Sequence, residues 1–203
     1  TKVSRDHLAY DALLLAAEGS LKRLGTDYLD LYLIHKLPPG MGFAPAETLQ
    51  ALARLQREGR ARHIGVSNFT PEQIAQAEGL LPGAKLEANE VEYNLLFQEA
   101  AKETIPFCKE REMRVIAHRP LGKGLLFQGK QELLDTLAQK YGKSRAQIAL
   151  NFIISQDITA IPKAGSKAHL RENLGALGWT MEAEDIELLR TLDGEFPYEK
   201  IKQ

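Results

Sequence analysis

The sequence predicts an α/β fold in which a parallel sheet closes into a barrel, on three observations. Short apolar stretches alternate with longer amphipathic ones, as expected for repeated strand–helix units. The 203 residues contain neither the G-x-G-x-x-G fingerprint of an open doubly wound sheet nor a P-loop. No linker, low-complexity segment or repeat interrupts the chain, so we expect one domain over residues 1–203.

The expected strands are short stretches rich in branched and aromatic residues. The first, YLDLYLIH, ends abruptly at His35, before a loop that contains Pro38, Pro39 and Gly40. Strands are expected at residues 28–35, 63–69, 85–94, 114–124 and 158–165.

The expected helices lie between these strands and carry start and stop signals. Leucines at helical spacing precede Gly25, a typical helix stop, and Thr70, followed by a proline and then by Gln73, is a typical helix start. Ser144 and Gln147 have the same capping spacing. Helices are expected at residues 11–25, 45–60, from Thr70 onward, 98–113, 130–141, 144–156, 167–174 and 181–193.

The number of strands is too small for a complete barrel. A (β/α)8 barrel has eight strands in about 250 residues, and we expect five strands here. The opening TKV leads directly into a helix, so it reads as the end of an earlier strand. We therefore expect an α/β protein with the (β/α)8 TIM barrel fold, of which this chain supplies about five C-terminal β/α units.

The composition excludes several classes of partner. With 26 basic and 27 acidic side chains, the formal net charge of −1 gives no general attraction to nucleic acid or acidic membranes. The apolar runs fall well short of the roughly 18 residues of a membrane span, and the start has no signal-peptide core. Cys108, the single cysteine, favours a reducing compartment. We expect a cytoplasmic protein, a monomer or weak oligomer.

Polar residues stand at the carboxyl ends of the predicted strands, where barrel enzymes place their active sites. Taken singly, each of these residues also has a purely structural explanation. A hydrogen-bonded residue at a strand end explains His35 about as well as a site residue does. Ser67 and Asn68 fit a turn, and Lys2 and Lys163 fit solvated surface charges. Together they form a candidate site. Its members are Lys2, His35, Ser67, Asn68, Glu90, Tyr93, Asn94, His118, Arg119 and Lys163.

Other chemistries find little support in the sequence. The five histidines are scattered and Cys108 falls in a predicted helix, so no metal site is expected. The G-x-S-x-G elbow of a serine hydrolase is absent. The loops PLGKG (120–124) and PKAGSK (162–167) offer backbone N–H groups and lysines, which suit a phosphorylated ligand.

Six segments, collinear from residue 1 to about residue 193, resemble the aldo-keto reductase superfamily. They are the opening TK, SLKRLGTDYLDLYLIHK, ARHIGVSNFTPEQI, EANEVEYNLL, VIAHRPLGKG and ITAIPKAGSKAHLRENLGAL. The resemblance implies a (β/α)8 barrel that binds NADP(H) without a Rossmann fold. It implies an oxidoreductase that reduces aldehydes or ketones to alcohols by hydride transfer.

The resemblance also implies roles for single residues. His35 matches a catalytic histidine that orients and polarises the substrate carbonyl, and Lys2 matches a catalytic lysine that favours ionisation of a tyrosine acid. The implied cofactor-binding residues are Ser67 and Asn68 at the nicotinamide carboxamide, Leu121, Gly122 and Lys123 over the pyrophosphate, Lys163 and Ser166 toward the 2′-phosphate, and Glu172 and Asn173 beside the adenine.

Three positions depart from the family pattern. Glu90 replaces a glutamine at the nicotinamide amide, and His118 replaces a tyrosine that stacks on the nicotinamide. His169 replaces an arginine that often clamps the 2′-phosphate, and a histidine carries little charge at pH 7. The last departure weakens a strict preference for NADP(H) and allows NAD(H) as a second cofactor.

The family's catalytic Asp and Tyr belong to segments before the position of Lys2 and are not found in residues 1–203. A truncated chain, a leading segment left out of the sequence or a short gene product would each explain this, and the missing initial Met favours the first two. We expect Lys2 to be poorly fixed without its Asp partner. We expect residues 1–203 alone to be inactive.

Two other functions stay open at this point. One is a non-catalytic regulator that keeps the barrel and binds the dinucleotide, which the missing Tyr would favour. The other is a different (β/α)8 enzyme, such as a lyase or an isomerase.

Overall fold

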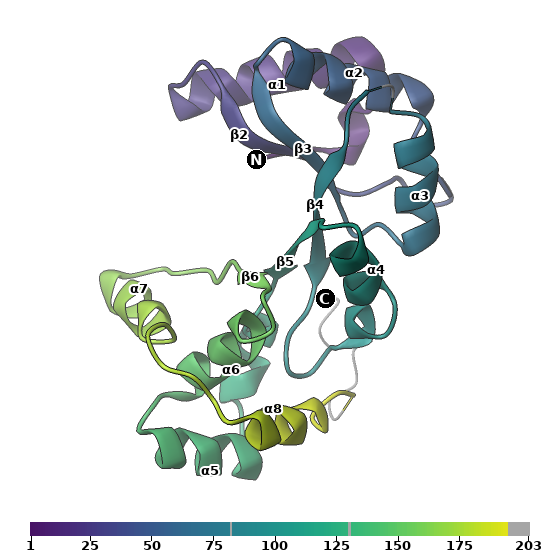
Figure 1. The fold of residues 1–203 in the computed structure, drawn as a ribbon. Helices are drawn as coiled ribbons and strands as arrows, with labels where there is room; N and C mark the ends of the chain where they lie inside the picture. The colour runs from purple at the N-terminus through teal and green to yellow at the C-terminus, as the bar shows by residue number, and fades with distance from the viewer. Residues whose placement is uncertain (82, 130, 195–203) are drawn as a thin grey trace. The chain divides into compact units, whose positions relative to one another are not determined.

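The computed structural model describes residues 1–81, 83–129 and 131–194, in which strands alternate with helices (Figure 1). The strands are β1 (Lys2–Val3), β2 (Leu29–Ile34), β3 (Ala61–Ser67), β4 (Leu86–Glu92), β5 (Arg114–His118) and β6 (Thr159–Ala160). The α-helices are α1 (Tyr10–Leu24), α2 (Ala46–Arg57), α3 (Pro71–Gly79), α4 (Thr104–Glu110), α5 (Glu132–Tyr141), α6 (Arg145–Ile154), α7 (Lys167–Leu174) and α8 (Ala183–Arg190). The short 3-10 helices are η1 (Arg5–His7), η2 (Glu99–Ala101) and η3 (Gly122–Phe127).

The order of the strands in the sheet follows the chain, β1-β2-β3-β4-β5-β6. The parallel pairs include β1 with β2, β2 with β3, β3 with β4, and β5 with β6. The chain divides into two compact units, which we call unit 1 (Thr1–Glu90 and Pro106–Arg114) and unit 2 (Val91–Ile105 and Val115–Gln203). Because helices connect parallel neighbours, the strand–helix repeat expected from the sequence is present.

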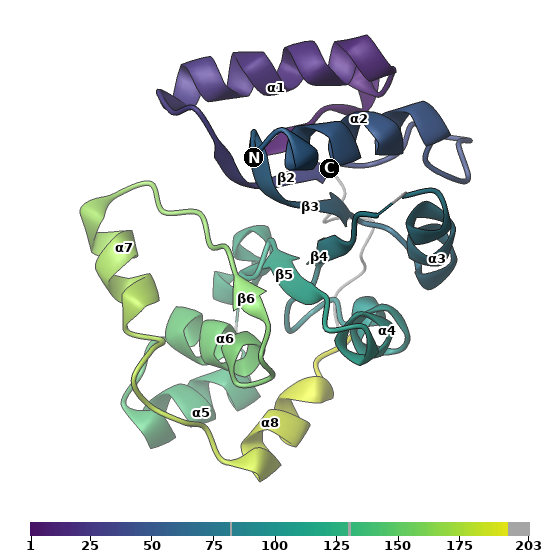
Figure 2. The same ribbon diagram turned by 45° about the horizontal axis from the view of Figure 1, so that its top comes forward.

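In unit 1, the strands pack under two helices. Helices α1 and α2 contact each other and lie on the same side of β2 and β3 (Figures 1 and 2). The fully buried side chains include Leu13 of α1, Leu52 of α2 and Ile64 of β3. At Gly65 of β3 the neighbouring strands come so close that an added Cβ would lie 2.3 Å from the carbonyl oxygen of Ala88. This position of the sheet therefore requires glycine.

In unit 2, helix α6 is the centre of the packing. It contacts α5, α7, η3 and β6. The ring of its Phe152 stacks on Tyr93 with 6.0 Å between ring centroids. The side-chain amide of Asn151 donates to the carbonyl oxygens of Ala176 (3.0 Å) and Trp179 (3.1 Å). The buried Asn151 amide thus fastens the connection between α7 and α8 to α6.

Most of the expected elements are confirmed, with small shifts of their ends. Thr70 and Ser144 both form complete capping boxes, at α3 and α6. Gly25 ends α1 in the left-handed conformation, with φ of 68°, and donates to the carbonyl of Leu21. The stop and start signals in the sequence were therefore sufficient to locate these helix ends.

The opening TKV, expected to be the end of an earlier strand, is confirmed as β1: Lys2–Val3 pairs in parallel with Leu33 and Ile34 of β2, beside the five strands expected further along the chain. Three of the expected bounds were wrong. The strand expected at 158–165 is only Thr159–Ala160. The expected helix at 98–113 is instead η2 followed by α4, and the expected strand at 114–124 ends at His118. Arg119, with φ of 53°, turns the chain away there.

Among the described residues, no helix has both the length and the apolar character needed to cross a bilayer.

Candidate functional site

Unit 1 brings five of the predicted site residues to the carboxyl ends of neighbouring parallel strands. Lys2 lies in β1, His35 directly follows β2, Ser67 closes β3 and Asn68 follows it, and Glu90 lies in β4. The backbone N–H of His35 donates to the carbonyl of Val3 in β1, 3.0 Å away. Parallel pairing therefore places these residues at one edge, as the barrel model of the sequence requires.

Asn68 connects three of these strand ends. Its φ of 60° is left-handed, a conformation that asparagine tolerates better than most residues. In this conformation its backbone N–H donates to the carbonyl of Glu90 (2.7 Å). Its side-chain amide donates to Ser67 Oγ (2.9 Å) and to the carbonyl of His35 (3.3 Å). Ser67 is fully buried and Asn68 is exposed, so Asn68 is the member of the pair that reaches the surface.

Lys2 forms an ion pair with Glu90. The distance between Lys2 Nζ and Glu90 Oε1 is 2.5 Å. The expectation that Lys2 is poorly fixed was wrong, because it treated the missing Asp as the only available anion. A carboxylate three strands away in the sheet holds the ammonium instead.

His35 is exposed at the end of β2 and its pKa is lowered. Partial loss of solvent is the main cause, followed by the positive charges of Lys2 and Lys36, and Glu90 opposes these effects. The imidazole is therefore neutral at pH 7. A neutral imidazole has one N–H donor and one acceptor nitrogen, so it can donate a hydrogen bond to a carbonyl oxygen.

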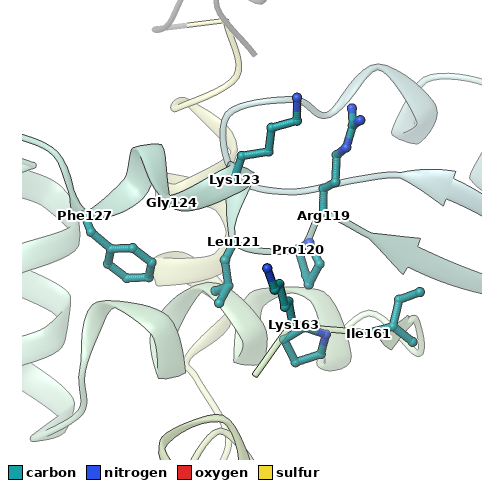
Figure 3. Close-up of a pocket in the computed structure, with 9 residues that line it drawn as sticks. Arg119, Pro120, Leu121, Lys123, Gly124, Phe127, Ile161 and Lys163 are labelled. Carbon is teal, nitrogen blue, oxygen red and sulfur yellow. The ribbon is translucent and has the colours of Figure 1, made fainter. Parts of the chain in front are cut away.

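Unit 2 contains a cavity of about 470 Å³ with basic side chains in its wall (Figure 3). Arg119, Lys123 and Lys163 line it, and Arg119 also forms an ion pair with Glu92, at 2.9 Å between Nη1 and Oε2. The lining residues are Arg119, Pro120, Leu121, Lys123, Gly124, Phe127, Ile161, Pro162 and Lys163. Three cations around one cavity suit an anionic ligand such as a phosphate.

The loop that carries Lys123 is tightly turned. Arg119, Gly122, Lys123 and Gly124 all have positive φ, between 53° and 88°. The N–H of Gly122 donates to the carbonyl of Arg119, and that of Gly124 to the carbonyl of Leu121, both at 2.9 Å. Two of the amides expected to cradle a phosphate are thus used inside the loop, so the attraction for an anion comes chiefly from the side chains.

The other predicted residues of unit 2 lie outside the wall of this cavity. Ser166 caps α7, where its Oγ accepts from the N–H of His169 at 3.2 Å. Glu172 and Asn173 lie near the end of the same helix, and the carbonyl of Glu172 accepts from Gln147 Nε2 at 3.0 Å. His118 closes β5 and is half-buried. Gly122 is buried next to Leu96 and Asn94.

Two candidates from the strand ends have structural roles, and one cofactor candidate was missed. Tyr93 is buried, and its hydroxyl donates to Gln156 at 3.1 Å. Asn94 donates to the carbonyl of Arg119 and accepts from the N–H of Leu96, so it holds the turn. Arg119 was named as a strand-end residue but not as a phosphate-binding one. Its place directly before the PLGKG loop, three residues before Gly122, could have indicated it.

No group of three or more His, Cys, Asp or Glu side chains suited to a metal ion occurs in the part of the chain that the structure describes.

Comparison with known proteins identifies relatives along nearly the whole chain. The family model of the aldo/keto reductase family matches residues 1–193. The chain is 35% identical over 191 residues to the methylglyoxal reductase YeaE of Escherichia coli, covering 92% of this chain and 65% of YeaE. It is 34% identical over 195 residues to a glyoxal reductase of Bacillus subtilis, covering 95% of this chain and 67% of that protein. The chain thus spans about two thirds of the length of these relatives.

The solved structures agree with the sequence matches. An aldo-keto reductase of Bombyx mori in complex with NADP superposes with a TM-score of 0.84 at 28% identity, covering 97% of this chain and 68% of that one. This match and the alternation of parallel strands with helices confirm the predicted fold class, a (β/α)8 barrel of which this chain supplies a part. The chain belongs to the aldo/keto reductase family.

Proposed function

We propose that this chain, in a polypeptide of its relatives' full length, reduces aldehydes or ketones to alcohols with NADP(H) as cofactor. The observation that carries the proposal is the hydrogen-bonded group in unit 1: Lys2, His35, Ser67, Asn68 and Glu90 occupy consecutive strand ends and are joined through Asn68 and the Lys2–Glu90 pair. Residues that only end strands would not need an ion pair between Lys2 and the buried carboxylate of Glu90.

The residues present fit NADP(H). Asn68 and Ser67 offer amide and hydroxyl groups for a carboxamide, and the Arg119, Lys123 and Lys163 side chains of unit 2 offer charge for phosphates. When bound, the reduced nicotinamide supplies the hydride. The family relative of Bombyx mori, solved with NADP, supports this choice of cofactor. We assign Leu121 and Gly122 to the pyrophosphate, Ser166 and His169 to the 2′-phosphate, Glu172 and Asn173 to the adenine, and His118 and Glu90 to the nicotinamide side.

The chain's own side chains have two tasks in this reaction. His35, neutral at pH 7, donates an N–H to the carbonyl oxygen of the substrate, which orients the carbonyl and polarises it. The ammonium of Lys2 favours the ionised form of the general acid that the family resemblance implies. Because hydride transfer places negative charge on the oxygen, a donor and a nearby cation both lower the barrier.

We propose small aldehydes, including 2-oxoaldehydes, as the substrates. Two relatives are named for methylglyoxal and for glyoxal. The non-catalytic alternative has no observation in its favour, because Lys2 and His35 are both present and are held at adjacent strand ends. We further propose that residues 1–203 belong to one barrel domain, that the protein is cytoplasmic, and that it works as a monomer or weak oligomer.

Titration of the protein with NADPH and NADH tests the cofactor assignment. Lys163→Ala is expected to lower the affinity for NADPH by about tenfold, which is the value of one charge-assisted contact. The affinity for NADH should fall much less. Nicotinamide or protein fluorescence provides the signal. Lys85→Ala is the control, because Lys85 belongs to unit 1 and lies 3.8 Å from a Glu112 carboxylate oxygen. An equal loss of affinity for both cofactors would show that Lys163 does not read the 2′-phosphate.

We also propose that residues 1–203 alone do not reduce carbonyl groups. The family's general acid is missing from this segment, and such a group is worth about 10²–10⁴-fold in rate. Methylglyoxal-dependent oxidation of NADPH should be measured for residues 1–203 and for an N-terminally extended polypeptide. Turnover of the short chain within tenfold of the longer one would refute the assignment of the acid to a residue outside 1–203.

A further inference from the structure

Glu90 is a buried carboxylate that has the Lys2 ammonium as its partner. The Glu90 side chain is 6% exposed and that of Lys2 is 30% exposed, with 2.5 Å between Oε1 and Nζ. Burial of a lone carboxylate is strongly unfavourable, and pairing with a cation at hydrogen-bonding distance offsets that cost. The pair therefore fixes Lys2 in a way that a solvated surface lysine would not be fixed.

The register of the sheet explains how a side chain on β1 reaches one on β4. Lys2 lies beside Leu33, Leu33 beside Gly65, and Gly65 beside Ala88. Register partners share a face of the sheet, and Glu90, two residues beyond Ala88, points to that face as well. Gly65 itself contributes no side chain to this face, and the tip of Leu33 lies above it, with Cδ2 2.8 Å from where a Cβ of Gly65 would be. The ion pair is therefore explained by the shared face of Lys2 and Glu90.

The main chain of Glu90 is held as firmly as its side chain. Glu90 is the register partner of Ser67 on β3, and its carbonyl accepts the N–H of Asn68 at 2.7 Å. A carboxylate on a fixed backbone is a rigid anchor, so it can place a flexible lysine side chain accurately.

We propose that Glu90 is a positioning residue for Lys2: its carboxylate holds the ammonium at the strand ends near His35 and offsets part of its charge. The inference rests on the proposed function, in which Lys2 and His35 serve carbonyl reduction. The glutamine that the family resemblance leads us to expect here could bind an amide but could not form an ion pair. The Glu90 carboxylate can therefore hold the Lys2 ammonium by an ion pair, which a glutamine amide could not do.

The charges that face His35 give a readout that does not depend on catalysis. Lys2 and Lys36 lower the pKa of His35, and Glu90 raises it. If the Glu90 carboxylate lies beside Lys2, Glu90→Gln removes the anion among these three charges. The midpoint of the His35 titration should then move to lower pH. Lys2→Met should move it to higher pH.

The first experiment is an NMR titration of the histidine ring protons in residues 1–203, with His35 assigned from the His35→Gln variant. Glu87→Gln is the matched control, because Glu87 lies on the same strand but pairs with His63, at 2.6 Å between Oε2 and Nδ1. We expect Glu90→Gln, and not Glu87→Gln, to lower the His35 midpoint. An unchanged midpoint in Glu90→Gln would overturn the proposed geometry.

The second experiment compares the steady-state kinetics of the same variants in the full-length protein. Misplacement of Lys2 is expected to lower kcat by about 10- to 100-fold, with a smaller change in KM. It should also move the alkaline limb of the pH profile to higher pH, because a misplaced ammonium no longer favours ionisation of the general acid. Glu90→Asp, which keeps the charge, should recover part of kcat, and it replaces Glu90→Gln if that variant fails to fold. Unchanged kcat and pH profile in Glu90→Gln, or a gain in NADPH affinity only, would overturn the inference.

The two experiments separate the inference from the proposed function. If the wild-type protein does not reduce carbonyl compounds, the proposed function fails, and the titration still decides whether Glu90 and Lys2 set the charge at His35. If the wild type is active and Glu90→Gln matches it in rate and pH profile, only the role of Glu90 fails.

Discussion

Replacement of Gly65 by alanine should destabilise the protein strongly, because the sheet leaves no room for a Cβ at this position. An added Cβ would lie 2.3 Å from the carbonyl oxygen of Ala88 and 2.8 Å from Cδ2 of Leu33. The leucine tip can rotate away, but the Ala88 carbonyl belongs to the paired backbone of β4 and cannot move without disturbing the β3–β4 register. The strands must therefore separate locally.

The size of the effect follows from the nature of the contact. Overpacking a well-packed core costs about 1–3 kcal/mol, and a clash with backbone belongs at the upper end of that range. About 3 kcal/mol corresponds to a fall in Tm of about 6–12 °C in a chain of this size. Urea denaturation followed by circular dichroism measures the free energy of unfolding, and a thermal scan gives Tm.

Gly79→Ala is the matched control for this experiment. Gly79 is the last residue of α3, and an added Cβ there would meet nothing within 4 Å. The substitution should leave the stability unchanged or raise it by up to about 1 kcal/mol. A Gly65→Ala protein as stable as the wild type would refute the close approach of β3 and β4 on which the Lys2–Glu90 argument partly depends.

Three further results are expected. Thr70→Ala breaks the capping box of α3 and should cost about 1 kcal/mol in urea denaturation, whereas Thr70→Ser should cost much less; equal losses would contradict the cap. His169→Arg should raise the affinity for NADPH relative to NADH in fluorescence titrations, because a guanidinium can pair with a phosphate through two N–H groups. An unchanged ratio of the two affinities would show that His169 does not face the phosphate. His35 should titrate below 6.5, the ordinary value. Since its folded pKa is lowered, the unfolded chain binds more protons near that pH, so the contribution of His35 to stability is present above 6.5 and is lost as the pH falls. A midpoint at or above 6.5 in the NMR titration would contradict this sign.

Local signals in the sequence were enough to predict much of the fold. The capping residues Thr70 and Ser144 and the stop at Gly25 depend on contacts within a few residues, so a short window of sequence contains them. The strand β1 was expected only as the end of an earlier strand, because two residues carry no periodicity of their own. Its extent is defined by pairing with β2, in which Lys2 lies beside Leu33 and Val3 beside Ile34.

The candidate site divides in the same way. His35, Ser67 and Asn68 were predicted because they follow recognisable strands. The Lys2–Glu90 pair was not, since it joins residues 88 positions apart and depends on the register of four strands. The sequence placed Arg119 directly before the PLGKG loop, but its left-handed backbone, with φ of 53°, was not predicted.

The most direct test of the central claim follows the hydride itself. The full-length protein should be incubated with methylglyoxal and NADPH that carries deuterium at both C4 positions, and the product analysed by mass spectrometry. The proposed function predicts an alcohol with one deuterium at the former carbonyl carbon, and much less of it with His35→Gln. An alcohol without deuterium, or no alcohol while the protein binds NADPH, would contradict the assignment of this chain to a carbonyl reductase.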